Sequence, residues 1–188
     1  GIDLGALEAA FRDGVKLFLF SNPNNPTGAV YSQAEIQAIG TLAARYGVKV
    51  ICDELYSRQI FDNHPYTHLR ALALMDNENL ITIMGPSKTE SISGFRLGAA
   101  FGSPSMILRM EKLQAIVSLR AAGYCQAVFD CWFNEPEGFM AERILAHQKI
   151  RDDLMERLMK VDGVSARKTE GGSYLFVKLP PLTVEIGD

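Results

Sequence analysis

A lysine flanked by two hydroxyl residues follows an apolar run near the middle of the chain. The stretch ITIMGPSKTESISGFRLG, residues 81–98, places Lys88 between Ser87 and Thr89, with Arg96 eight positions later. A lysine between an apolar run and a glycine-rich strand is expected to be desolvated, so that its ammonium group loses a proton more readily. A neutral amine is a nucleophile towards a carbonyl group, and the planar fork of an arginine suits a phosphate. The ordinary alternatives are a solvated surface lysine and an arginine in an ion pair.

Other polar residues follow predicted strands in the same way. Asn25 comes after a strand at 15–20, and Asp53 and Tyr56 come after a strand at 48–52. The carboxyl ends of parallel strands meet at one edge of a sheet, and ligands bind outside that edge. An amide, a carboxylate, a phenol and an amine are therefore expected to converge in one crevice. Taken singly, an asparagine or aspartate at such a place is more often a turn or cap residue.

The elements that must position these residues alternate as in an α/β protein. The turn-rich stretch SNPNNPTG, residues 21–28, joins a strand to a helix capped by Ser32 and Glu35, and a further strand follows. Such a unit normally makes parallel neighbours with a right-handed crossover. Apolar periodicity predicts helices at 4–13, 32–47, about 104–120, 122–133 and 137–160. It predicts strands at 15–20, 48–52, 80–84 and 96–102, and further strands around 164–167 and 173–179.

Composition and charge exclude several classes of protein. The chain has 188 residues, 47% of them hydrophobic, with a net charge of −3, which favours neither a nucleic-acid partner nor a membrane surface. No apolar run approaches the roughly eighteen residues of a membrane span, and no signal peptide is expected from the first residues. Cys52, Cys125 and Cys131 lie among apolar neighbours without metal-ligand spacing, which predicts buried free thiols. A cytoplasmic protein is expected.

Four short motifs carry a resemblance to a known family. They are NPNNPTG (22–28), DELY (53–56), SKT (87–89) and GFRLG (94–98). In this order and spacing they resemble the successive signatures of the fold-type I, class I/II pyridoxal-phosphate-dependent aminotransferases. The resemblance covers nearly the whole chain. It implies pyridoxal 5′-phosphate as cofactor, an amino acid and a 2-oxo acid as substrates, and a homodimer that builds its sites across the subunit interface.

The resemblance implies a catalytic role for Lys88 and a cofactor-binding role for Asp53. Lys88 matches the lysine that forms the internal aldimine, a Schiff base with the cofactor, and then moves a proton between substrate and cofactor. Asp53 matches the carboxylate that pairs with the pyridinium nitrogen. An anion there keeps the nitrogen protonated, which makes the ring a better electron sink.

The resemblance also implies roles for the other candidates. Asn25 and Tyr56 match the two donors to the 3′ oxygen of the cofactor. Arg96 matches the arginine that binds the cofactor phosphate, with Ser87 as its companion. Pro26 matches a position where the family often has a cis peptide bond.

Some positions depart from the family pattern. Gly85 replaces a serine or threonine that commonly helps to bind phosphate, Glu90 stands where an aromatic residue is common, and Phe95 stands where tryptophan is frequent. The last two are interpreted as structural variation. The family's glycine-rich phosphate loop and the aromatic that stacks on the cofactor would precede Gly1, and its substrate-carboxylate arginine would follow Asp188. The 188 residues are therefore expected to hold an incomplete active site.

We expect a three-layer α/β fold with a mostly parallel sheet flanked by helices, corresponding to an incomplete aminotransferase large domain. Residues 1–136 would be part of the cofactor-binding large domain, 137–160 a long connecting helix, and 161–188 the beginning of a small α+β C-terminal domain. The chain starts inside an alternating pattern and stops after a lone strand, which predicts a fragment of a longer protein.

Three functions remain open from the sequence. The first is a transaminase, and the second is a β-C–S lyase or another elimination enzyme, which would share the lysine, the aspartate and the arginine. The third is the aminotransferase-like effector domain of a transcription regulator.

Overall fold

The order of helices and strands follows the alternation expected for an α/β chain. The computed structural model describes residues 1–181. Its elements are α1 (Leu4–Arg12), β1 (Leu17–Ser21), α2 (Gln33–Tyr46), β2 (Lys49–Asp53), η1 (Leu69–Leu72), η2 (Asn77–Asn79), β3 (Leu80–Met84), α3 (Pro86–Thr89), η3 (Ser93–Phe95), β4 (Ala99–Phe101), α4 (Pro104–Val117), α5 (Gly123–Gln126), η4 (Ala127–Asp130), α6 (Phe139–Leu158), β5 (Ser165–Ala166) and β6 (Val177–Lys178).

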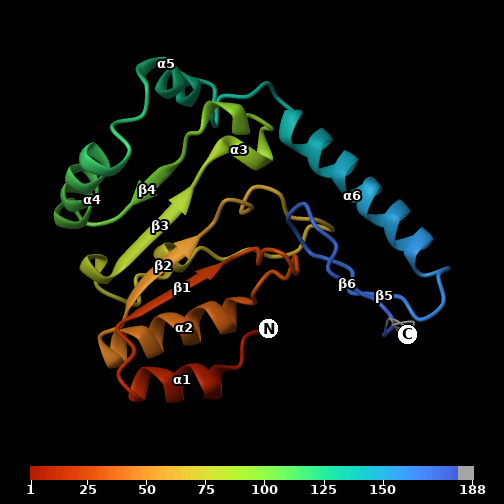
Figure 1. Cartoon of the computed structure of the whole chain (residues 1–188), viewed down its shortest axis with the longest axis horizontal. Helices are drawn as coiled ribbons and strands as arrows, with labels where there is room; N and C mark the ends of the chain where they lie inside the picture. Colours follow the sequence, from red (N-terminus) through yellow and green to blue (C-terminus); the bar gives the residue numbers. More distant parts are fainter. Residues whose placement is uncertain (182–188) are drawn as a thin grey trace, which may run out of the picture.

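One mostly parallel sheet organises the larger part of the chain (Figure 1). The strands lie in the order β1-β2-β3-β4; β2 is parallel to both β1 and β3, and β4 is antiparallel to β3. A separate two-stranded antiparallel sheet, β5-β6, follows α6. The prediction of a mostly parallel sheet flanked by helices is confirmed.

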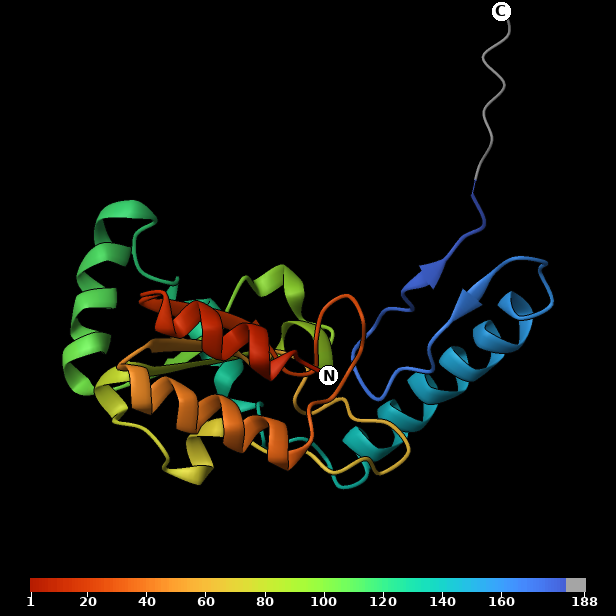
Figure 2. The ribbon, with the colours of Figure 1, turned by 90° about the horizontal axis from the view of Figure 1, so that it is seen from below.

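The apolar core lies between α1, α2 and one face of the sheet. Figure 2 shows these two helices side by side along the strands. Ile36 and Ile39 of α2 are fully buried and belong to the same cluster as Phe20, Val50 and other side chains of the strands. On the other face of β1, Leu17 and Leu19 are 55% and 64% exposed, so the described residues cover one face of this strand only.

Local sequence signals set the helix ends. Ser32 and Glu35 form the predicted capping box of α2, and Gly47 ends that helix in a left-handed conformation with φ 62°. The hydroxyl of Ser103 accepts a hydrogen bond from the amide of Met106, and Pro104 occupies the first turn of α4. These caps fix where the helices begin relative to the strands.

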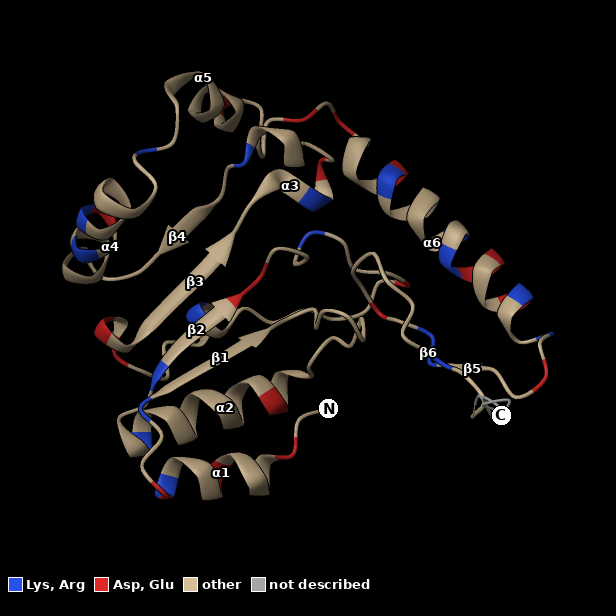
Figure 3. Ribbon diagram, in the orientation of Figure 1, with Lys and Arg blue, Asp and Glu red and all other residues tan. Residues whose placement is uncertain are grey.

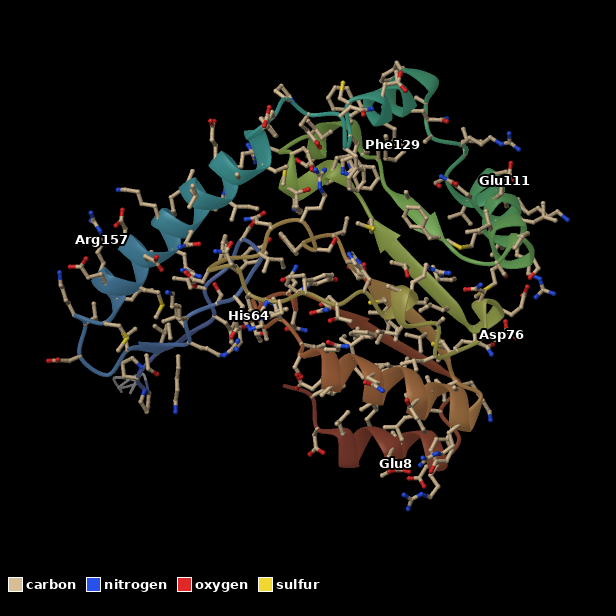
Figure 4. All side chains as sticks on the ribbon, turned by 180° about the vertical axis from the view of Figure 1, so that it is seen from behind. Glu8, His64, Asp76, Glu111, Phe129 and Arg157 are labelled. Atoms are coloured by element: carbon tan, nitrogen blue, oxygen red, sulfur yellow. The ribbon has the colours of Figure 1, made fainter. Side chains whose placement is uncertain are left out.

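The predicted helix at 122–133 is wrong. Only two short elements lie there, since the α-helix α5 gives way directly to the 3-10 helix η4, beside a group of aromatic side chains (Figure 4 labels Phe129). The ring of Trp132 lies 5.3 Å from Phe129 and 4.7 Å from Phe133, and Phe133 has a positive φ of 66°. A helix cannot continue through such a residue.

Two further expectations are corrected. The predicted strand at 173–179 shortens to Val177–Lys178, because only these residues face a partner in β5. The cysteines are free as predicted, but only Cys52 is buried; Cys125 is half-buried and Cys131 is exposed. The latter two thiols belong to the segment that fails to form the predicted helix.

Candidate active site

Hydrogen bonds between the first three strands bring their carboxyl ends level with one another. Ser21 pairs with Asp53, and Asp53 pairs with Ile83 in the next strand. The ladder continues one residue beyond the strands, with the Asn22 amide 2.9 Å from the carbonyl of Asp53 and the Glu54 amide 2.8 Å from that of Ile83. Every candidate that follows a strand therefore starts from the same edge of the sheet.

Asn25 lies on the turn-rich loop after β1. Its backbone amide donates a hydrogen bond to Ser21 Oγ at 3.2 Å, and the residue is exposed. The peptide bond between Asn25 and Pro26 is cis, as expected, and the bond between Asn22 and Pro23 is cis as well. Asn22 is fully buried, and its Oδ1 accepts a hydrogen bond from the amide of Tyr31. The loop is thus anchored at its start and exposes Asn25.

Asp53 is the last residue of β2 and is half-buried. Its Oδ1 accepts a hydrogen bond from the amide of Leu55 at 3.0 Å. The next residue, Glu54, points away from Asp53 because side chains alternate along a strand. Glu54 is 1% exposed and its Oε2 lies 2.5 Å from His68 Nδ1.

Tyr56 combines burial with an unpartnered hydroxyl. The residue is 5% exposed, and among the described residues its phenol oxygen has no partner in good hydrogen-bond geometry, although the side chains of Tyr174 and Ser173 lie close enough to influence its pKa. Its ring lies edge-on to Tyr174, with the centroids 6.5 Å apart. Burial, aided by the proximity of Tyr174, raises the pKa of Tyr56 to about 12. The phenol therefore remains a neutral donor at physiological pH.

Lys88 lies on the four-residue helix α3, which begins at Pro86 after β3 ends. The expectation that this lysine is buried is wrong for the described residues: Lys88 is exposed, whereas its neighbour Thr89 is buried. The apolar run before it forms β3 and does not bury the lysine. Its accessibility suits an amine that must reach a ligand.

The phosphate candidates lie where the chain turns into β4. Ser87 Oγ donates a hydrogen bond to the carbonyl of Leu97 at 3.3 Å, which connects α3 to the segment of Arg96. Arg96 is exposed, has a φ of 52°, and donates from Nη1 to the carbonyl of Ser93. Together with Gly94, Arg96 lines a cavity of about 430 Å³. The other five candidates do not line that cavity.

Gly85 shows how closely the two strands approach beside the lysine. A Cβ atom there would lie 3.2 Å from the Cα atom of Gly98 and 3.2 Å from the carbonyl oxygen of Leu97. A serine or threonine would therefore meet the backbone of the next strand. A side chain at this position would require the neighbouring backbone to shift by a few tenths of an ångström.

The sequence missed an ionic cluster beside the lysine. Arg58 binds both Glu90 and Glu135, and Arg143 binds Thr89 and Ser91. The one local signal is Glu90, which stands where an aromatic residue is common. The interpretation of Glu90 as structural variation stays a prediction; the structure adds that its carboxylate forms an ion pair with Arg58.

Comparisons with known proteins now bear on this arrangement. Residues 1–186 match the aminotransferase class I and II family. The chain belongs to this family. A probable aspartate/prephenate aminotransferase of Rickettsia felis is 32% identical over 92% of the chain and 42% of its own length. A crystal structure of an aspartate aminotransferase from Rhodobacter sphaeroides matches 98% of the chain with a TM-score of 0.94 and 61% identity, over 47% of its own chain.

A third match concerns the cofactor of that protein. A putative aminotransferase from Clostridium difficile, described as bound to pyridoxal phosphate, shares 25% identity and a TM-score of 0.78 over 94% of the chain and 46% of its own. The chain thus spans less than half the length of the aminotransferases that it matches. Within residues 1–181, no helix is both long and apolar enough to span a membrane, and no group of His, Cys, Asp and Glu side chains is arranged to hold a metal ion.

Proposed function

We propose that the protein containing this chain transfers an amino group from an amino acid to a 2-oxo acid with pyridoxal 5′-phosphate as cofactor. One observation carries the proposal. A buried, unpartnered phenol donor, Tyr56, lies three residues after Asp53 at the sheet edge from which Lys88 also extends. A buried donor without an acceptor is unfavourable, and a bound ligand would supply the acceptor.

The donor set fits this cofactor. Asn25 and Tyr56 would donate to the 3′ oxygen, and Arg96 and Ser87 would bind the phosphate. The backbone before Arg96 includes Gly94, where a Cβ atom would meet nothing within 4 Å, so the phosphate has open access. When bound, the cofactor supplies an electron sink for the charge left at the amino acid Cα after proton removal.

Each residue of this chain then has a defined task. The half-buried Asp53 carboxylate would hold a proton on the pyridinium nitrogen by charge pairing. Lys88, exposed on α3, would carry the cofactor before substrate arrives and would then move the proton at Cα as a general base. Because β2 lies between β1 and β3, Asp53 lies between the strand that leads to Asn25 and the strand that leads to Lys88.

The alternative functions have less support. The relatives described above are named as aminotransferases, and none of those names describes a lyase or a regulator. Product analysis separates the reactions, since an elimination enzyme releases ammonia and a 2-oxo acid without an acceptor. A transaminase needs a 2-oxo acid for turnover.

The wider organisation is part of the same proposal. We infer that residues 1–136 belong to a cofactor-binding large domain, 137–160 to a connecting helix, and 161–188 to the start of a small domain, of which 182–188 lie outside the described residues. The run of α6 from Phe139 to Leu158 supports this division. A homodimer is supported by Ile116 and Val117 of α4, which are 82% and 81% exposed. A cytoplasmic location is consistent with the free cysteines.

The test is reduction of the longest natural form of the protein with borohydride after incubation with pyridoxal phosphate, followed by peptide mapping. The expected result is cofactor fixed on Lys88, lost in Lys88→Arg and retained in Lys112→Arg, which removes an exposed lysine of α4. L-aspartate is the first amino donor to test, because the relatives are named for it. A folded protein that fixes no cofactor on Lys88 would overturn the proposal.

A further inference from the structure

We propose that Arg58 and Arg143 are positioning residues that hold the turn carrying Lys88, residues 86–91, from two sides. The inference rests on the proposed function, because it concerns the lysine assigned to catalysis there. The clamp consists of the Arg58–Glu90–Glu135 ion cluster on one side and of hydrogen bonds from Arg143 on the other.

Arg58 joins the turn to a distant segment through two carboxylates. Its Nη1 lies 2.5 Å from Glu90 Oε1, and its two terminal nitrogens lie 2.7 and 3.0 Å from the two carboxylate oxygens of Glu135. The side chains of Arg58, Glu90 and Glu135 are 18%, 7% and 12% exposed. A largely buried, two-pronged pair of this kind is geometrically specific, and removal of one partner leaves a buried charge unpaired.

The far side of the cluster is itself fixed. The guanidinium carbon of Arg58 lies 4.2 Å from the centre of the Phe133 ring. The amide of Phe133 also donates a hydrogen bond to Glu135 Oε1 at 3.1 Å. Glu135 is therefore not a loose counter-ion, and Arg58 can transmit its position to Glu90.

Arg143 of α6 holds the turn on either side of Glu90. Its Nε donates to the carbonyl of Thr89 at 2.7 Å, and its Nη2 donates to Ser91 Oγ at 2.6 Å. Figure 1 shows α6 beginning close to α3, and Figure 3 shows charged residues at both places. Two arginines from separate parts of the chain thus bind three consecutive residues that directly follow Lys88.

The turn needs these contacts because its own local structure gives it little stability. The helix α3 contains only four residues, and helices of that length are not stable without tertiary contacts. Ser91 adopts a positive φ of 59°, a conformation that non-glycine residues keep only when their surroundings impose it. Since Lys88 is exposed, the backbone of this turn is what determines where its flexible side chain starts.

Loss of the clamp would therefore misalign the Lys88 amine, while the other residues of the site would stay in place. A displacement of about 1 Å at a reacting group can reduce a rate by roughly a hundredfold. Glu90→Gln keeps the shape of the side chain and removes its charge, and Arg143→Gln removes both hydrogen bonds from α6. Glu137→Gln is the matched control, because Glu137 is an exposed carboxylate in the segment of Glu135.

The experiment uses the longest natural protein and measures how fast pyridoxal phosphate becomes fixable by borohydride on Lys88, with the other lysines as internal standards. We expect the rate at Lys88 to fall by roughly ten- to a hundredfold in Glu90→Gln and Arg143→Gln. The rates at Lys112 and Lys149 should stay unchanged, as should every rate in Glu137→Gln. Arg143→Lys should recover part of the rate, because an ammonium can still donate to one of the two acceptors.

The outcomes separate the two proposals. If the wild-type protein fixes cofactor elsewhere than on Lys88, the proposed function fails and the clamp fails with it. If Lys88 is labelled normally in the wild type and equally fast in both folded variants, the clamp alone is overturned. If Glu90→Gln does not fold, Arg143→Gln decides the question, and a lower melting temperature with an unchanged Lys88 rate would show a purely structural role.

Discussion

Gly28 and Thr169 lie in direct contact, although 141 positions separate them in the chain. A Cβ atom on Gly28 would lie 2.4 Å from Thr169 Cβ and 2.8 Å from the carbonyl oxygen of Gly171, and the φ of Gly28 is 66°. The carbonyl of Gly28 accepts a hydrogen bond from the Glu170 amide at 3.0 Å. The loop that presents Asn25 is therefore held by the segment that follows α6.

The first prediction is that Gly28→Ala destabilises the protein more than Gly47→Ala does. Both glycines have a φ near 60°, so each substitution costs about 1 kcal/mol from the left-handed backbone alone. Nothing lies within 4 Å of a Cβ on Gly47, whereas a Cβ on Gly28 would overlap Thr169. That overlap should add about 1–3 kcal/mol.

Urea denaturation of the two variants measures this difference. Thr169→Ser combined with Gly28→Ala should recover part of the loss, because it removes a methyl group that lies 2.5 Å from the new Cβ. Equal free energies of unfolding for Gly28→Ala and Gly47→Ala would show that the contact is not formed.

The second prediction concerns the pH dependence of stability. Hydrogen bonding to the buried carboxylate of Glu54 raises the pKa of His68 above its ordinary value. The ion pair therefore contributes fully below about pH 6.5, where the unfolded chain also carries the proton, and its contribution is lost as pH rises through the raised pKa. His68→Gln should therefore lower the free energy of unfolding more at pH 6 than at pH 9.

The size of this effect is limited by solvent. The His68 side chain is 45% exposed, so the pH-dependent part should stay below about 1 kcal/mol. Free energies of unfolding measured at both pH values test it, with His64→Gln as the control, whose ring contacts the carbonyl of Pro65. A cost of His68→Gln that grows with pH would contradict the assigned ion pair.

The third prediction concerns an ion pair whose contribution to stability is lost as pH falls. The hydrogen bonds from Arg58 lower the pKa of Glu135 to about 2, whereas burial raises the pKa of Glu90. Arg58 makes two bonds to Glu135 and one to Glu90, so we assign the stronger charge pairing to Glu135. Its contribution is present above about pH 4.3 and is lost as pH falls towards 2.

Glu135→Gln should therefore lower the free energy of unfolding by about 2 kcal/mol at neutral pH and by much less at pH 2. Acid titration of the folded fraction at fixed urea concentration measures the change, and the exposed Glu137→Gln should leave the profile where it is. A constant cost of Glu135→Gln from pH 7 to pH 2 would show that the ion pair with Arg58 contributes nothing.

Signals that lie close together in the sequence predicted the framework of the site. The apolar strands, the Ser32 capping box and the motif after each strand are local, so Asp53 and Lys88 could be assigned to one sheet edge. The contact between Gly28 and Thr169 could not be predicted, because it depends on how α6 returns the chain to the sheet. Periodicity also failed to predict the bounds at 122–133, where a short α-helix gives way to a 3-10 helix and Phe133 has a positive φ.

The same limit explains the missed clamp. Arg58 and Glu90 are 32 positions apart, and Arg143 and Thr89 are 54 apart. Charged residues at such separations show no pattern in a single sequence, since their pairing follows from tertiary structure. The unusual identity of Glu90 was the only local trace of the cluster.

The fourth prediction is that Tyr56→Phe weakens cofactor binding without weakening the fold. The phenol of Tyr56 is buried without a partner in good hydrogen-bond geometry among the described residues, and the nearby side chains of Tyr174 and Ser173 affect its pKa only, so its removal should leave the free energy of unfolding nearly unchanged. With pyridoxal phosphate present, the same change removes a donor and should raise the dissociation constant by roughly tenfold. Because the pKa of Tyr56 is raised to about 12, the loss should be the same from pH 6 to pH 9.

Fluorescence titration with pyridoxal phosphate and urea denaturation of the cofactor-free protein test both halves of this prediction. Tyr174→Phe is the matched control, because its ring lies against Tyr56 but is 47% exposed. It should change the dissociation constant by less than about twofold, as expected for a hydroxyl already in contact with water. If Tyr56→Phe instead lowers the stability of the cofactor-free protein and leaves binding unchanged, the hydroxyl serves the fold, and its assignment to the 3′ oxygen is wrong.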